Sequence, residues 1–123
     1  MTKAAALHNF FSGFGLTAYE ENSVPDDAVF PYLTYSLTTD SFSDYPSTIT
    51  ISLWYRSTSW AAANAKCEEI SAGIGYGGKL VICDGGRIWI KRGQPFANSM
   101  GDTSDDQIKR KVINVTVDYL TLN

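Results

Sequence analysis

Apolar and polar residues alternate one for one in three separate stretches of the chain, 32–38, 48–55 and 108–120. Successive side chains of a β-strand point to opposite faces, so a period of two predicts strands with one buried and one solvated face. Such strands are typical of an antiparallel sheet that is covered on one side only. A chain of 123 residues is long enough to bury one core of this kind, and we expect a single domain over residues 1–123.

Two other stretches have the periodicity of a helix. The first covers residues 2–12, where Thr2 can cap the helix and Gly13 and Gly15 can end it. The second follows the polar cluster Ser57-Thr58-Ser59. Apolar residues recur there every three or four positions on one helical face: Trp60, Ala63, Cys67, Ile70 and Ile74. We expect both helices to pack their apolar faces against the sheet.

A β-hairpin is predicted around Asp84-Gly85-Gly86, which separates the β-rich runs 79–83 and 87–92. Glycine tolerates the positive φ that such tight turns require. Residues 16–19 are a candidate for one more short strand. The sequence therefore predicts an α+β fold, with an antiparallel-rich β-sheet of about five strands and two α-helices packed on one face.

The charges are distributed unevenly along the chain. The net charge is -3, which disfavours a general nucleic-acid-binding protein, since such domains carry basic faces. Residues 1–45 contain six carboxylates and, as the only basic side chain, Lys3, whereas the remainder has a balance of +2. Opposed potentials could align copies of the chain with one another, acidic flank against basic flank. The alternative is that these are ordinary solvated faces, as solubility requires.

No catalytic or metal-binding pattern is present in the sequence. His8 is the only histidine, and Cys67 and Cys83 lack the spacing of a zinc site. The glycines of residues 73–78 match a dinucleotide-binding motif, but they follow a predicted helix and precede a strand, the reverse of the order that the motif requires. We therefore expect no enzymatic activity, no cofactor and no metal. No apolar run approaches the ~20 residues that cross a bilayer, so we also expect no membrane partner.

One segment is expected to be a long loop. Residues 93–106 are polar and rich in turn-forming residues, and loops of that length are usually functional or disordered. Phe96 and Met100 lie within it and suggest that it becomes ordered against another surface, such as a neighbouring subunit. A solvated loop with one ring tucked into the core is the other interpretation.

The order of elements, together with four short phrases, resembles a known family. The phrases are Phe30-Pro31-Tyr32-Leu33-Thr34-Tyr35, Ile49-Thr50-Ile51-Ser52-Leu53-Trp54-Tyr55, Ser57-Thr58-Ser59-Trp60-Ala61 and the stretch from Asp106 to Val115. In these phrases and in size the chain resembles the tail terminator proteins of long-tailed bacteriophages, also called tail-completion or head–tail joining proteins. The resemblance covers nearly the whole chain.

The resemblance implies a structural protein of the virion. Such proteins form a ring of six copies that caps the finished tail tube, ends its polymerisation and offers a joining surface to the connector on the head. The implied partners are the chain itself, the tail tube protein, the connector protein and, in transit through the ring, DNA. Assembly would take place in the cytoplasm of the bacterial host. On this hypothesis the candidate contacts with neighbouring copies or the tube are Arg92, Phe96, Met100 and Asp102.

Two alternatives remain open at the level of the sequence. The first is another neck component of the virion, such as a head-side stopper or an adaptor. The second is a small module that binds a ligand between helix and sheet. The aromatic residues that could line such a pocket are Tyr32, Tyr55, Trp60 and Trp89.

Overall fold

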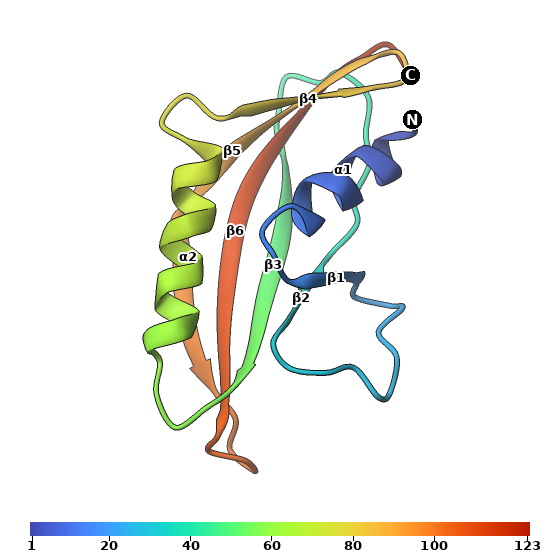
Figure 1. The fold of residues 1–123 in the computed structure, drawn as a ribbon. Helices are drawn as coiled ribbons and strands as arrows, with labels where there is room; N and C mark the ends of the chain where they lie inside the picture. Colours follow the sequence, from blue (N-terminus) through green and yellow to red (C-terminus); the bar gives the residue numbers. More distant parts are fainter.

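The computed structural model describes residues 1–123 and contains two helices and one six-stranded sheet (Figure 1). The elements follow one another as α1 (Lys3–Ser12), β1 (Thr17–Glu20), β2 (Tyr32–Tyr35), β3 (Ser47–Arg56), α2 (Ala61–Ile74), β4 (Lys79–Cys83), β5 (Gly86–Gly101) and β6 (Ile108–Thr121). Neither helix has the length and apolar character needed to cross a membrane.

The sheet has the strand order β1-β2-β3-β6-β5-β4, so that β1 and β4 are its two edges. Four of the five strand pairs are antiparallel, and β1 pairs with β2 in parallel. Both helices lie on the same face of the sheet, with α2 running beside β5 and β6 (Figure 1). The α+β prediction is therefore confirmed, with six strands in place of about five, because residues 17–20 do form a short strand.

The core lies between the sheet and the helices and consists of 22 buried apolar residues. The alternation in the sequence places every second residue of the long strands in this core, as predicted. The innermost side chains of β3 and β6 include Ile49, Ile51, Leu53, Ile113 and Val115. Leu37 is an exception, because β2 ends at Tyr35 and the side chain of Leu37 is exposed.

The helix boundaries have the predicted local causes. The Thr2 side chain accepts a hydrogen bond from the backbone N–H of Ala5, and helix α1 ends at Ser12, directly before Gly13. Helix α2 begins at Ala61, where the Ser59 hydroxyl accepts a hydrogen bond from the Ala61 N–H. Its predicted stripe is buried on the sheet at Ala63, Cys67, Ile70 and Ile74, while Trp60 packs partly buried beside the core.

The β4–β5 hairpin turns at Asp84 and Gly85, as expected from the Asp-Gly pair. Gly85 has φ of 81° and Gly86 has φ of 155°. A Cβ atom at Gly86 would clash with the Leu120 carbonyl oxygen on the neighbouring strand. Only glycine allows the two backbones to approach so closely.

The long loop expected over residues 93–106 is the main error of the sequence prediction. Strand β5 continues to Gly101, and its last part pairs with β6 from Ala97↔Ile113 to Gly101↔Lys109. An irregularity between Arg92 and Ala97 shifts the register and breaks the alternation that would have marked a strand. Only residues 102–107 remain as the connection to β6.

Candidate interaction surfaces

The side chains that could bind a metal or act in catalysis do not come together in one site. No group of three or more His, Cys, Asp or Glu side chains is placed to hold a metal ion. Nδ1 of His8 lies 2.9 Å from the hydroxyl of Tyr35, so the ring serves to pack α1 on the sheet. Both cysteines are free and buried, and burial raises the pKa of the Cys67 thiol. None of these groups forms a nucleophile–base pair.

The four candidate contact residues do not form one surface. Arg92 faces the helix layer, where its guanidinium donates to the Ser71 hydroxyl at 3.0 Å, and Phe96 packs partly buried against the core. Met100 is exposed on the opposite face of the sheet, and Asp102 belongs to the β5–β6 turn. Met100 and Asp102 share a small hollow of about 110 Å³ next to Trp54.

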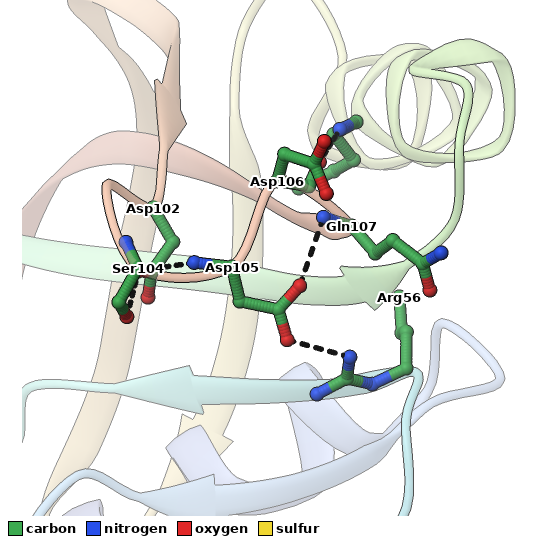
Figure 2. A network of polar contacts seen from close by, with 7 residues as sticks. Arg56, Asp102, Ser104, Asp105, Asp106 and Gln107 are labelled. Carbon is green, nitrogen blue, oxygen red and sulfur yellow. Dashed lines mark hydrogen bonds and ion pairs between the residues drawn. The ribbon is translucent and has the colours of Figure 1, made fainter.

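Asp102 organises the β5–β6 turn (Figure 2). Its Oδ1 accepts hydrogen bonds from the backbone N–H and hydroxyl of Ser104 at 2.8 and 2.7 Å, and these bonds lower the pKa of the Asp102 carboxyl. The Asp105 carboxylate accepts hydrogen bonds from the Arg56 guanidinium at 2.7 Å and from the Gln107 N–H at 3.0 Å. These bonds lower the pKa of the Asp105 carboxyl as well. The turn is thereby tied to the end of β3 by side chains that solvent reaches.

A row of large side chains crosses the face of the sheet that the helices leave uncovered. The Tyr32 and Trp54 rings stack with centroids 6.1 Å apart, Tyr19 meets Tyr32 edge-on at 5.9 Å, and the Arg110 guanidinium lies 4.6 Å from the Trp54 centroid. Met100 is the strand partner of Arg110. We call this row the open-face ladder, defined as Tyr19, Tyr32, Trp54, Arg110 and Met100.

The polar groups of the open-face ladder form hydrogen bonds to side chains on the same face of the sheet. The Trp54 indole N–H donates to the Thr34 hydroxyl at 2.9 Å. The Arg110 guanidinium donates twice to the Ser52 hydroxyl, at 3.2 and 3.1 Å. Thr34 and Ser52 are consequently buried although they point away from the core. The ladder thus acts as a thin cover over the strands β2, β3 and β6.

The other end of the same face is less well covered. On the edge strand β4, Leu80 and Ile82 point away from the core and are 49% and 75% exposed. On β6, separated from Ile82 by Arg87 of β5, Leu120 is exposed beside Phe42 and Leu122. We call this group the β4-edge patch, defined as Phe42, Leu80, Ile82, Leu120 and Leu122. Apolar groups of this kind on a surface mark contact sites for other molecules.

The four aromatic residues suggested for a ligand pocket do not line one cavity. Tyr55 points into the core, whereas Tyr32, its near neighbour across β2 and β3, belongs to the open-face ladder. Trp89 lies on the open face with its indole N–H bonded to the Gly77 carbonyl at 2.9 Å, and Trp60 lies at the start of α2. The space between helices and sheet is filled by the core, so this prediction of a shared pocket is wrong.

Comparisons with protein-family models, with curated proteins and with solved structures give no match for this chain. The functional argument therefore depends on the surfaces described above. Of the two apolar residues that the sequence singled out in residues 93–106, Met100 is exposed and Phe96 is partly buried against the core. The sequence missed the open-face ladder, whose members come from five strands. It also missed Leu80 and Ile82, which follow the glycine-rich segment at residues 73–78.

Proposed function

We propose that this chain is a structural protein of a bacteriophage virion, a tail terminator that forms a ring on the completed tail tube. The ring would end tube polymerisation and present the surface to which the head connector joins. In this role the chain acts through contacts with copies of itself, the tube protein and the connector. DNA passes through the ring without being held by it.

One observation carries the proposal: the sheet is covered by helices on one face only, and the opposite face exposes the β4-edge patch and Met100. An edge strand that exposes Ile82 at 75% offers a site to which another chain can attach. The order of elements on which the resemblance to tail terminators depends is also the order found in the structure. Both features favour assembly as the function.

The direct test is to remove the gene from the phage or prophage that carries it and to examine the tails by electron microscopy. A tail terminator predicts tails of abnormal length that are not joined to heads. Supplying the full chain from a plasmid should restore uniform tails and joined particles. Tails of normal length that still join heads in the deletion strain would refute the proposal.

The same experiment separates the neck alternatives. A head-side stopper or adaptor would leave tails of uniform length and would instead produce heads that leak DNA or fail to join. Immunogold labelling of separated heads and tails then decides between the two positions. Label on the free end of isolated tails supports the terminator, and label on isolated heads supports a stopper or adaptor.

A further inference from the structure

Strand β4 is an edge strand that is protected only near its two ends. Lys79 lies at its start, and directly after it Asp84 is bonded to the carbonyl oxygen and the ammonium group of Met1. The strand pairs with β5 on one side and has no strand on the other, and its pairing contains no bulge and no proline. Leu80 and Ile82 both project from it onto the uncovered face. Natural proteins normally blunt such edges with charge, proline or a covering segment, because an open apolar edge recruits other chains. Lys79 is the only charge in β4.

The charge around β4 is positive. The β4–β5 hairpin from residue 79 to residue 92 contains Lys79, Arg87, Lys91 and Arg92 against Asp84 alone, a balance of +3. Lys79 and Arg87 are exposed and make no salt bridge, whereas Lys91 is paired with Asp118 at 2.7 Å. The apolar edge is therefore flanked by basic side chains that are free to meet an acidic partner.

The opposite edge of the sheet carries the complementary charge. Residues 13–35, which contain β1 and β2, have four carboxylates and no basic side chain: Glu20, Glu21, Asp26 and Asp27. Except for Glu20, which is half-buried and bonds to Asn22, these carboxylates are exposed. The apolar Val29 is 78% exposed in the same stretch. We call residues 20–29 the acidic flank.

From these observations we infer that the β4–β5 hairpin of one copy docks on the acidic flank of the next copy, head to tail. The strand order places the two surfaces at opposite edges of the sheet, and Figure 1 shows them well apart. Contacts between two different surfaces of identical chains propagate and close into a ring when the rotation permits. The inference rests on the ring of the proposed function and deepens it by identifying the seam between copies.

The test uses two charge-reversed variants of the full chain. Variant one carries Lys79→Glu and Arg87→Glu in the hairpin, and variant two carries Glu21→Lys and Asp27→Lys in the acidic flank. All four side chains are exposed, so folding should be retained, which circular dichroism checks. The control is Glu68→Lys, an exposed charge reversal on α2. Self-association is measured by sedimentation velocity and native mass spectrometry from 1 μM to 1 mM.

Each variant alone should associate at least tenfold more weakly than the wild type, because like charges then face each other at every seam. An equimolar mixture should recover assembly, because every seam of an alternating ring again joins opposite charges. Ile82→Ser, which removes the apolar side chain without adding a charge, should weaken association as well, and the control should not. Raising salt from 50 to 500 mM should weaken the wild-type assembly through screening.

Three results would overturn the inference: a wild-type chain that stays monomeric at 1 mM, a mixture that assembles no better than its components, or a variant two that assembles like the wild type. The last result would show that the acidic flank lies outside the contact between copies. The proposed function is tested separately, by measuring the length of the tails in the deletion strain. If variant one restores normal tails in the deletion strain, the seam is wrong and the terminator role still stands.

Discussion

The ionisation of the buried Tyr119 hydroxyl offers a test of the packing of the core. The side chain is 3% exposed near the end of β6, and its hydroxyl donates to the Thr38 carbonyl. Burial, together with the charges of Asp40 and Cys83, raises the pKa of Tyr119 from 10.0 to about 12. Two pKa units correspond to about 2.7 kcal/mol of stability that depends on this hydroxyl remaining protonated.

The sign of the effect follows from which state loses the proton first. The unfolded chain releases the Tyr119 proton near pH 10, and the folded protein holds it until about pH 12. The contribution is therefore fully present below pH 10. It is lost at about 1.4 kcal/mol per pH unit as the pH rises between these values. The variant Tyr119→Phe has no hydroxyl to ionise, so its stability does not fall between pH 10 and pH 12 for this reason.

The assay is urea unfolding of the wild type and Tyr119→Phe from pH 8 to pH 12. At pH 8 the variant should be less stable by about 1 kcal/mol, because the Thr38 carbonyl loses its donor. Close to pH 11 the wild type should become the less stable of the two proteins. Its alkaline loss of unfolding free energy there exceeds the deficit of about 1 kcal/mol that the variant has at pH 8. Other tyrosines with a raised pKa, such as Tyr35 and Tyr55, are present in both proteins and cancel in the difference. A difference that stays constant from pH 8 to pH 12 would refute the reasoning.

Two further predictions concern packing. Ile113→Ala empties a fully buried position at the centre of β6 and should lower the free energy of unfolding in urea by about 2–5 kcal/mol; a loss below 1 kcal/mol would mean that the core is not packed there. Gly86→Ala should lower it by about 1–3 kcal/mol from backbone strain alone, with more from the clash with Leu120. Gly101→Ala in the same strand is the control, since its Cβ would meet nothing within 4 Å, and equal losses for the two glycines would contradict this account.

Local sequence was sufficient for most elements of the fold. The alternation in 48–55 and 108–120 marks strands because each has one face in the core and one outside it. The stripe from Ala63 to Ile74 marks a helix for the corresponding reason. These signals are short-range consequences of burial on one side, so a single sequence contains them.

The second half of β5 could not be found in this way. Gly93 and Pro95 interrupt the strand pattern, and the register shift after Arg92 moves the following residues out of phase. What keeps this segment extended is its pairing with β6, together with a bond from the Asn114 amide to the Pro95 carbonyl at 3.1 Å. Those partners lie 8 to 19 residues away, from the pair Gly101↔Lys109 to the bond between Asn114 and Pro95, and a local pattern does not report them.

The interaction surfaces could not be predicted from the sequence, because they depend on the order of the strands in the sheet. The uneven charge was visible in the sequence, but only the order β1-β2-β3-β6-β5-β4 places the acidic and basic stretches at the two edges of one sheet. In the same way, Tyr32, Trp54 and Arg110 are separated by 22 and 56 residues in the sequence. They become neighbours through the registers Tyr32↔Trp54 and Trp54↔Arg110. Sequence spacing carries no trace of such cross-strand pairs.

The position of Trp89 has a practical consequence. Its indole lies directly across from Leu80, with the Lys91 ammonium 4.2 Å from the ring centroid and its N–H held by Gly77. A molecule that covers Leu80 on the open face also displaces water around this ring. The chain thus contains a built-in optical reporter, because indole emission shifts to shorter wavelength as its surroundings dry. Trp54 and Trp60 emit as well, so the difference between the wild type and Trp89→Phe reports occupancy of that edge in real time, without a dye.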